Sequence, residues 1–393
     1  MTDNVFTRIL DGGVRYEEDQ RLHRLTLTAP DGTVLHESAL AQWSGHWLKT
    51  LQIELTDRCN ERCLHCYIPN HTKDRALQMS AQTVKDLLRQ FRAMNGLRII
   101  FSGGETLLHP DIMDLLGYAR ELDLMLFLHT NALTLTESQA QRLGELRMFN
   151  VQVSLYSHKA EEHEAITCRK GSWQRTIDGL RKLARHHVPV TISCPIMRQN
   201  VNSIESLHAL AASMGFECYF DDIMMARHDG DTGNLQVRIA PAEMPSLIER
   251  MIRMRPDFME AIRESKSEDE LLTRQFARRM NMCGIMSSGM CIDSDGTAYP
   301  CAGWNGMRIG NIHQTPLAEI WTRGDRVAEL RSVTPKRFDK CGKCTLHNFC
   351  DMCVVYNYNE NADIATPCAA FCQKARITKS VVMKIYNEHH NNG

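Results

Sequence analysis

Cysteine is the residue type of this sequence that most plainly suggests chemistry. The chain has 15 cysteines among 393 residues, and most of them lie in three groups. Cys168, Cys194 and Cys218 stand apart, and we expect the last two to be packed core residues. The grouped cysteines are Cys59, Cys63 and Cys66, then Cys283, Cys291 and Cys301, and finally Cys341, Cys344, Cys350, Cys353, Cys368 and Cys372.

Grouped thiols in a chain without an export signal favour metal binding over disulfide bonds. The N-terminal residues MTDNVFTRIL lack a secretion signal, and an odd number of cysteines suits a disulfide framework poorly. Four thiolates normally hold an iron–sulfur cluster, whereas the C-x3-C-x2-C segment CNERCLHCY offers three. A three-thiolate site leaves one iron open to an outside ligand. For the third group alone, zinc held by Cys341, Cys344, Cys350 and Cys353 is the alternative.

Composition and charge bound the class of protein. The apolar fraction of 43 % is typical of a globular chain. With 46 basic and 47 acidic residues the net charge is −1, which gives no general attraction to nucleic acid or anionic lipid. No apolar run approaches the roughly 18 residues of a membrane span. We therefore expect a cytoplasmic protein of two to three folded units, without nucleic acid or membrane as a partner.

Strands and helices alternate between residues 50 and 226. Residues 50–55 and 97–102 are strand-like, and the helical period of 80–94 begins at Ser80, a predicted N-cap. We count about six βα repeats, fewer than the eight of a closed barrel. The sequence thus predicts an α/β fold, a partial (β/α)6 barrel of TIM type. The candidate site residues at the carboxyl ends of its strands are Gly103, Gly104, Glu105, Thr130, Asn131, Ser154, Asp221 and Asp222.

Outside the barrel the pattern changes. A hairpin centred on Asp31–Gly32 is predicted over 24–38, another on Asp295–Gly296, and a single helix over 316–332. The expected units are an N-terminal hairpin segment (1–49), the barrel (50–240), an amphipathic helical connector with methionine packed inward (241–282), a cysteine-rich domain (283–375) and a C-terminal helix (376–393).

The segment CNERCLHCY resembles the signature of the radical S-adenosylmethionine (SAM) superfamily, and the similarity extends over about residues 50–375. The superfamily's GGE and TNG segments are matched in part, with Thr106 where proline is usual and Ala132 in place of glycine. The resemblance implies that Cys59, Cys63 and Cys66 hold a 4Fe–4S cluster that binds SAM. It also implies a SAM site that contains Tyr67 on the adenine, Gly103, Gly104 and Glu105 near the amino group, Thr130 and Asn131, and Ser154 near the ribose.

The C-terminal cysteines resemble the SPASM extension of these enzymes, apart from Cys353, which follows Cys350 after two residues rather than three. The resemblance implies two auxiliary 4Fe–4S clusters, hence three clusters in all. Cys291 is extra to the pattern, and is either a fourth ligand of the first auxiliary cluster or a packed residue. The implied ligands are Cys283, Cys301 and Cys353 for one cluster, and Cys341, Cys344, Cys350 and either Cys372, which we favour, or Cys368 for the other.

SPASM enzymes mostly modify peptides. His163, Thr167, Gly171 and Ser172 resemble a segment common in maturases of ribosomally made peptides (RiPPs), although a scaffold loop and helix N-cap would account for Ser172 equally well. The resemblance implies cleavage of SAM to a 5′-deoxyadenosyl radical that abstracts hydrogen from a peptide, giving an oxidative crosslink or thioether. The implied partners are a precursor peptide, an electron donor such as flavodoxin or ferredoxin, and a separate leader-recognition protein.

Several alternatives stay open at this point. They are a sulfatase-type formylglycine maturase, a peptide epimerase, a haem or quinone biosynthesis enzyme, and a non-catalytic iron–sulfur or sensor protein. An epimerase needs a hydrogen donor, for which Cys168 or Cys291 is the candidate. Asp221 and Asp222 are the candidate bases. Because adjacent residues of a strand point to opposite faces, at most one of the two serves.

Overall fold

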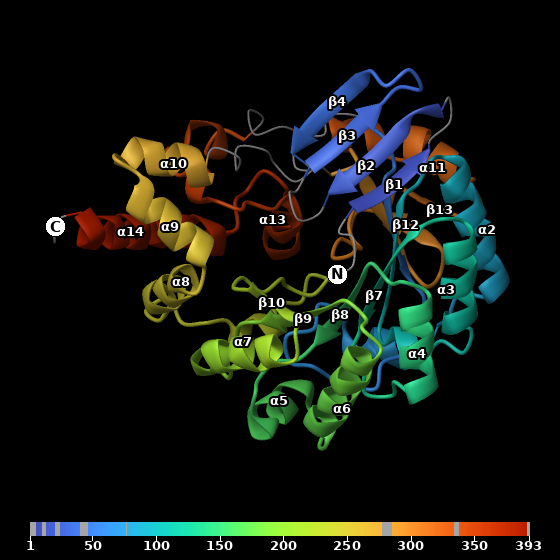
Figure 1. The fold of residues 1–393 in the computed structure, drawn as a ribbon, viewed down its shortest axis with the longest axis horizontal. Coiled ribbons are helices and arrows are strands. Elements are labelled where there is room, and N and C mark those ends of the chain that lie inside the picture. The colour runs from blue at the N-terminus through green and yellow to red at the C-terminus, as the bar shows by residue number, and fades with distance from the viewer. Residues whose placement is uncertain are drawn as a thin grey trace.

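The computed structural model describes residues 5–9, 13–19, 24–39, 46–75, 77–276, 285–333 and 338–390. Two sheets organise the described chain (Figure 1). One is a four-stranded antiparallel sheet from the N-terminal segment. The other has nine strands in the order β10-β9-β8-β7-β6-β5-β11-β12-β13.

Six consecutive parallel strands form the larger part of the second sheet. They are β5 (Thr50–Glu54), β6 (Arg98–Ser102), β7 (Met125–Thr130), β8 (Asn150–Ser154), β9 (Val190–Pro195) and β10 (Glu217–Asp221). The α/β fold with a parallel sheet is therefore confirmed. The helices between the strands are α1 (Asn70–Arg75), α2 (Ala81–Ala93), α3 (Ile112–Glu121), α4 (Glu137–Glu145), α5 (Ala160–Thr167), α6 (Ser172–Arg185) and α7 (Ile204–Ser213). Ser80 caps α2 as predicted, since its hydroxyl accepts from Thr83 N at 3.1 Å.

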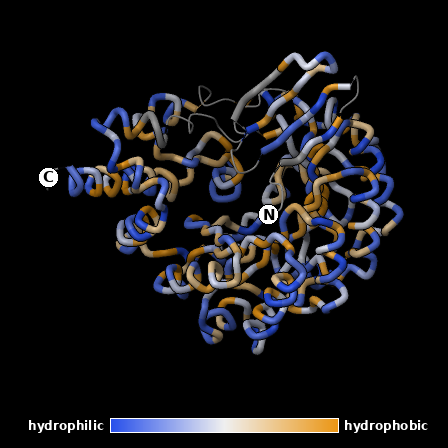
Figure 2. The backbone as a smooth tube through the Cα atoms, in the orientation of Figure 1, coloured by the Kyte–Doolittle hydropathy of each residue, from blue (hydrophilic) through white to orange (hydrophobic). Residues whose placement is uncertain are grey.

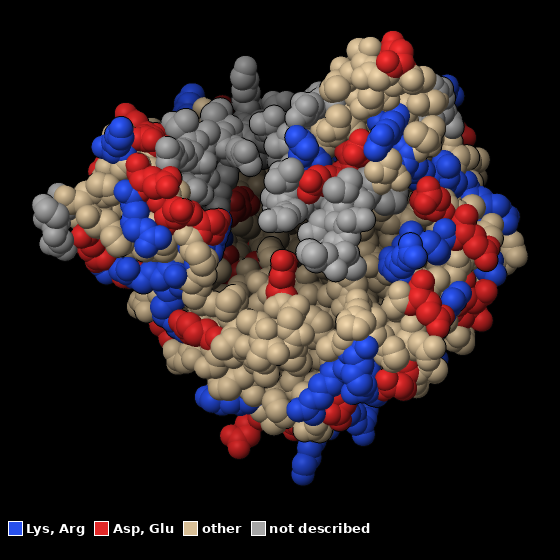
Figure 3. Space-filling view, viewed as in Figure 1, with Lys and Arg blue, Asp and Glu red and all other residues tan. Residues whose placement is uncertain are grey.

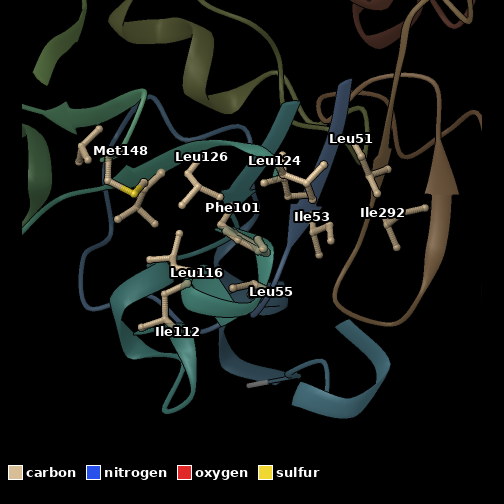
Figure 4. Packing of buried hydrophobic residues seen from close by; sticks show 14 of the residues in the cluster. Leu51, Ile53, Leu55, Phe101, Ile112, Leu116, Leu124, Leu126, Met148 and Ile292 are labelled. Atoms are coloured by element: carbon tan, nitrogen blue, oxygen red, sulfur yellow. The ribbon is translucent and has the colours of Figure 1, made fainter. Parts of the chain in front are cut away.

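The barrel strands are apolar on alternating, buried positions, and their side chains form one continuous core. Figure 4 shows part of it, with Phe101 of β6 among side chains from neighbouring strands and from α3. Ile292, from the cysteine-rich part of the chain, lies near Leu51 of β5 in the same cluster. Figure 2 shows the hydrophobic segments concentrated inside and hydrophilic residues on the outer helices and loops. The barrel and the C-terminal part therefore share a core.

The sheet continues into the cysteine-rich part through β11 (Gly289–Ile292), which pairs parallel with β5. β11 and β12 (Thr297–Tyr299) form the hairpin predicted on Asp295–Gly296, and Gly296 has the positive φ of 82° that favours glycine. The short β13 (Gly310–Asn311) ends the sheet. The pairing of β11 with β5 was not predicted.

Helices make up most of the remainder. The expected single helix over 316–332 is wrong, because the chain breaks at Gly324, where a Cβ would stand 2.4 Å from Ile320 O. The described part of the connector, residues 241–276, contains three helices that pack with α14 in a separate apolar cluster. These helices are α8 (Met244–Arg253), α9 (Pro256–Glu264), α10 (Glu268–Phe276), α11 (Leu317–Arg323), α12 (Val327–Arg331), α13 (Val354–Asn361) and α14 (Ala369–His390), with 3-10 turns at Thr106–Leu108, Val201–Ser203, Gly233–Val237, Cys341–Lys343 and His347–Phe349.

The N-terminal sheet consists of β1 (Val5–Ile9), β2 (Arg15–Asp19), β3 (Arg24–Thr28) and β4 (Val34–Ala39). The predicted hairpin is confirmed as β3 and β4, whereas β1 and the polar strand β2 were not predicted. Tyr16 and Leu25 pack on Leu97, and Glu18 forms an ion pair with Arg98. Because Arg98 begins β6, the N-terminal sheet sits at the amino end of the barrel strands.

The surface carries both signs of charge. On the face shown in Figure 3, basic and acidic side chains are interspersed, as the net charge of −1 leads one to expect. A membrane-crossing helix, which would have to be long and apolar, is not found among the described residues.

The core predicts a stability effect at Phe101, which is fully buried. Phe101→Ala should lower the free energy of unfolding by about 3–5 kcal/mol, because it removes apolar contact and leaves a cavity. Tyr219→Ala, at an aromatic side chain of the same sheet that is 59 % exposed, should change it by about 0.5 kcal/mol or less. Urea unfolding of both variants measures the difference. Equal effects would contradict the placement of β6 in the core.

Candidate functional site

A cavity of about 300 Å3 lies at the carboxyl ends of the barrel strands. It collects residues from the cysteine loop, from the ends of β6 to β10, and from the C-terminal part. The predicted residues that line it are Cys59, Cys63, Cys66, Tyr67, Gly103, Gly104, Glu105, Thr130, Asn131, Ser154 and Asp221. Parallel α/β folds place ligand sites at this end of the sheet, so the cavity is the candidate site.

The cysteine loop, residues 57–67, brings its three thiols to the cavity wall. Burial raises the pKa of Cys59 to about 11 and that of Cys63 well above its ordinary value, and the neighbouring thiols add to both shifts. Thiols that are protonated at neutral pH become thiolates when a metal binds. The three sulfurs thus face one space, and no further cysteine is among the described residues that line it.

Backbone hydrogen bonds tie the loop to α5, the helix that follows β8. Arg62 N donates to Thr167 O at 3.1 Å and Leu64 N to Ile166 O at 2.9 Å, both at the end of α5. Thr167 and Ser172 share a hydroxyl–hydroxyl hydrogen bond of 2.8 Å. The segment that resembles peptide maturases therefore braces the cysteine loop. Its N-cap position belongs to Gly171, and Ser172 is the first helical residue.

Gly103 and Gly104 bring the end of β6 against the start of the cysteine loop. Gly104 N donates to Thr56 O at 2.7 Å, and a Cβ on Gly104 would stand 2.3 Å from Arg58 O. Gly103 has φ of 134°, and its Cβ would meet Thr56 O at 2.6 Å. The resemblance places these glycines near the amino group of SAM. The structure shows a further reason for glycine here, because the missing side chains make room for the loop backbone.

Glu105 is fixed by the protein around it. Its carboxylate accepts hydrogen bonds from Thr130 Oγ1 at 2.5 Å, Asn131 N at 2.7 Å and Leu107 N at 2.9 Å. Burial raises its pKa, although these donors oppose the shift. Asn131 Nδ2 in turn donates to Asn60 Oδ1 at 2.6 Å. The GGE segment, the Thr130–Asn131 turn and the cysteine loop therefore form one connected unit.

Tyr67 and Ser154 also line the cavity. The Tyr67 hydroxyl donates to Glu54 Oε1 at 3.3 Å, so the ring is anchored on β5. Burial, together with the charge of Asp293, raises the pKa of Glu54 to about 8. Glu54 is therefore mostly protonated at neutral pH.

The two adjacent aspartates separate as the strand geometry predicts. Asp221 lines the cavity, and its Oδ1 accepts from Ile223 N at 3.2 Å. Burial is the main cause that raises the pKa of Asp221. Asp222 instead forms an ion pair of 2.6 Å with Lys374 of α14. Only Asp221 is placed to meet a ligand in the cavity.

Cys168 is not brought to the cavity. It is exposed and ends α5 in a left-handed conformation with φ of 54°. Its geometry gives no support to a role as hydrogen donor. Cys194, which was expected to be packed, is buried with 1 % exposure.

The auxiliary cysteines fall into two neighbourhoods. Cys291 and Cys301 lie close enough for Cys301 to raise the pKa of Cys291 beyond the effect of burial, and Cys353 acts likewise on Cys301. Cys283, the remaining predicted ligand of this group, lies outside the described residues. Cys291 thus lies near Cys301, which in turn lies near Cys353.

The second neighbourhood contains Cys341, Cys344, Cys350 and Cys372. Burial, with Cys372 adding to it, raises the pKa of Cys341, and the same causes raise that of Cys350 to about 11. Cys368 instead donates from its Sγ to Glu360 Oε1 at 3.2 Å. The arrangement favours Cys372 as the closing ligand. Within the described residues, no three or more His, Cys, Asp or Glu side chains are grouped to hold a metal ion as they stand, so the ligand sets stay predictions.

Sequence reasoning missed several cavity residues. Lys73 of α1 and Glu61 of the cysteine loop are buried on the cavity wall, and Glu61 Oε1 has no hydrogen-bond partner among the described residues. Burial raises the pKa of Glu61 to about 7. Tyr356 of α13 also lines the cavity. For Lys73 and Glu61 the only sequence signal was their closeness to the loop cysteines. The helix that carries Lys73, α1, is polar throughout and shows no apolar face.

Comparisons with known proteins agree with this geometry. Residues 53–211 match the profile of the Radical SAM superfamily, and residues 283–345 match that of SPASM, an iron–sulfur cluster-binding domain. AdoMet-dependent heme synthase of Methanosarcina barkeri is 24 % identical over 327 residues, 79 % of this chain and 92 % of that protein. Mycofactocin maturase MftC of Mycobacterium tuberculosis is 25 % identical over 312 residues, 76 % of this chain and 75 % of that protein.

Two solved structures share the fold. The histidine-tagged anSMEcpe with bound AdoMet has a TM-score of 0.67 and 16 % identity, and the alignment covers 88 % of this chain and 95 % of that one. SuiB of Streptococcus suis bound to precursor peptide SuiA has a TM-score of 0.61 and 18 % identity, covering 80 % and 74 %.

The packing of Gly104 yields a prediction about iron binding. Gly104→Ala places a methyl group against Arg58 O and must displace the cysteine loop. We expect the anaerobically reconstituted variant to bind less iron than the unaltered protein, as measured by iron and sulfide analysis. Gly117→Ala is the matched control, since its Cβ would lie 3.4 Å from Arg142 Nη2, an ordinary contact. Full iron content in the Gly104 variant would show that the close approach does not matter.

Proposed function

Because the chain carries a radical SAM domain followed by a SPASM iron–sulfur domain, we propose that it is an enzyme that cleaves SAM and abstracts hydrogen from a peptide. The observation that carries the proposal is the cavity in which three thiols of one loop face Gly103, Gly104 and Asp221. These two domains imply SAM and 4Fe–4S clusters as cofactors. The number of clusters, three, is part of the proposal.

The donor set fits the SAM-binding cluster. Cys59, Cys63 and Cys66 would hold three irons, and the cavity beside them would take SAM. When bound, the reduced cluster and SAM supply the 5′-deoxyadenosyl radical, which removes a hydrogen atom from the substrate. The chain's own part is to position these groups and to exclude water, with Ile68, Met224 and other apolar side chains in the cavity wall.

Asp221 would complete the oxidation. After a hydrogen atom has left the substrate, loss of one proton and one electron gives the net removal of two hydrogens. The carboxylate of Asp221 faces the cavity and would accept that proton. The electron would pass to the auxiliary cluster that Cys353 would help to hold. Burial raises the pKa of the Cys353 thiol, two backbone hydrogen bonds lower it, and the charge of Asp221 raises it further. Base and electron acceptor therefore lie near each other.

A peptide substrate is supported by two considerations. A cavity of about 300 Å3 is at the lower end of ligand pockets, so most of a peptide substrate would lie outside it. Among structures of this fold is SuiB, bound to a precursor peptide. A tetrapyrrole is the second candidate, because the heme synthase relative aligns over 92 % of its length.

The proposal predicts a specific product. The reconstituted protein, given SAM and dithionite without oxygen, should release 5′-deoxyadenosine, measured by liquid chromatography. A Cys59→Ala, Cys63→Ala, Cys66→Ala variant should release none and keep about two-thirds of the iron, as three equal clusters require. A protein with full iron that makes no nucleoside would refute the enzyme.

The same assay separates the two substrate classes. The probes are a short peptide encoded beside the gene and an iron porphyrin with propionate side chains. Peptide modification should appear as a mass loss of two hydrogens together with more 5′-deoxyadenosine. If only the porphyrin changes mass, the peptide proposal fails and the second candidate stands.

Asp221 and Asp222 offer a matched pair of variants. Asp221→Asn should slow product formation at least about tenfold and spare formation of 5′-deoxyadenosine, because only the proton acceptor is lost. A base must be deprotonated to accept a proton, so the rate of the unaltered enzyme should decrease as the pH falls through the pKa of Asp221. Because that pKa is raised, the decrease should begin above the pH range of an ordinary carboxyl group, and the Asp221→Asn variant should not show it. Asp222→Asn breaks the ion pair with Lys374 and should keep the pH profile. Identical profiles for the two variants would rule Asp221 out as the base.

A further inference from the structure

Lys73 is a buried cation on the wall of the thiol cavity. It belongs to the short helix α1, its exposure is 4 %, and it lines the same space as Cys59, Cys63 and Cys66. Lysine is almost never buried without a partner, because removing an ammonium group from water is costly unless an anion compensates it. The charged and polar groups around Lys73 therefore indicate which anion compensates its charge.

The other charged side chains of α1 pair with residues beside the cysteine loop. Asp74 lies 2.7 Å from Arg62, which is within the loop, and Arg75 lies 3.2 Å from Asp57 at its start. These two ion pairs, made by the two residues that follow Lys73, link α1 to the loop. The helix is thereby fixed with the Lys73 side chain directed into the cavity.

No carboxylate of the described chain forms an ion pair with Lys73. Its electrostatic partners are instead Cys66, Cys59 and Cys63, which line the same cavity. The anions that would compensate this buried lysine are therefore the cysteine sulfurs in the thiolate form that they take when a metal binds.

Lys73 is also the one permanent cation among the described residues that line the cavity. Two histidines, His65 and His129, line it as well, but burial disfavours the charged form of an imidazole. The acidic groups on the wall are Glu61 and Asp221, together with Glu105. Removing Lys73 would leave the thiol site without a positive charge on the described part of this wall.

We propose that Lys73 is the built-in counter-charge of the cluster held by Cys59, Cys63 and Cys66, and that it makes this cluster easier to reduce. A reduced cluster carries one more negative charge than the oxidised one. A fixed ammonium group beside it, and a hydrogen bond to a ligand sulfur, stabilise the reduced form more. Reduction must precede SAM cleavage, so Lys73 would act before any substrate is involved.

The test is an EPR-monitored redox titration of the anaerobically reconstituted full chain, without substrate. The signal of the first cluster is obtained by subtracting the spectrum of the Cys59, Cys63 and Cys66 alanine variant. At the midpoint potential of the unaltered protein, Lys73→Gln should lower the ratio of reduced to oxidised cluster about tenfold, a shift of about 59 mV for one electron. Lys73→Arg keeps the charge and should titrate like the unaltered protein.

Lys49→Gln is the matched control, because Lys49 is also buried, with 5 % exposure, and lies just before the opposite end of β5. Its midpoint should not move. If the Lys73→Gln variant does not bind the cluster, two further variants test the charge. Retention of the cluster in Lys73→Arg and its loss in Lys73→Met would then show that the positive charge is what matters. An unchanged midpoint in Lys73→Gln overturns the proposal, and so does a Lys73→Arg variant that behaves like Lys73→Gln.

Lys73 could instead bind the carboxylate of SAM, and the affinity for SAM, measured on the same proteins, distinguishes this role from that of a counter-charge. An unchanged midpoint with weaker SAM binding would assign Lys73 to a carboxylate of the ligand and would overturn the counter-charge. The proposal rests on the proposed function only for the presence of the cluster. Because the titration uses no substrate, a failed shift would leave the radical enzyme standing, whereas an unaltered protein with no cluster at the three cysteines would refute both.

Discussion

The close contact between the end of β6 and the start of the cysteine loop is the constraint on which the rest of the site depends. Gly104 N and Glu105 N donate to Thr56 O and Arg58 O, each at 2.7 Å. Glu105 then holds the turn after β7, and Asn131 of that turn returns to Asn60 of the loop at 2.6 Å. The hydrogen bonds form a closed ring of three segments. Such a ring holds the three thiols in position through contacts of the chain itself.

Strand β5 extends this arrangement to the cysteine-rich part of the chain. One edge of β5 pairs with β6, and the other pairs with β11, which carries Cys291. Ser294, in the turn after β11, donates to Asp57 Oδ1 at 2.6 Å. The two cysteine-bearing regions are thus fixed to one strand. An electron that leaves a substrate in the cavity would have a short route to the auxiliary cysteines.

Sequence reasoning was most successful where chemistry and periodicity coincide. The C-x3-C-x2-C loop, the six parallel strands and the alternation that separates Asp221 from Asp222 follow from residue type and spacing. The packing of the loop backbone against Gly104 could not be predicted, because that backbone follows a strand that pairs with β6 only in the folded sheet. Strand β2 was missed because it is polar, and it buries Glu18 through an ion pair with the distant Arg98. Strand β1 was also not predicted, although three of its five residues are apolar. Lys73 was also missed, because its helix has no apolar face that would predict burial and because Lys73 meets the loop cysteines only in the folded chain.

The central claim is that the three loop thiols hold a cluster with an iron open to SAM. Its most direct test is the EPR spectrum of the reduced, anaerobically reconstituted protein, recorded before and after addition of SAM. The account predicts that the signal absent from the Cys59, Cys63 and Cys66 alanine variant changes shape when SAM is added, while the auxiliary signals stay as they were. A spectrum that does not change at saturating SAM would contradict the account.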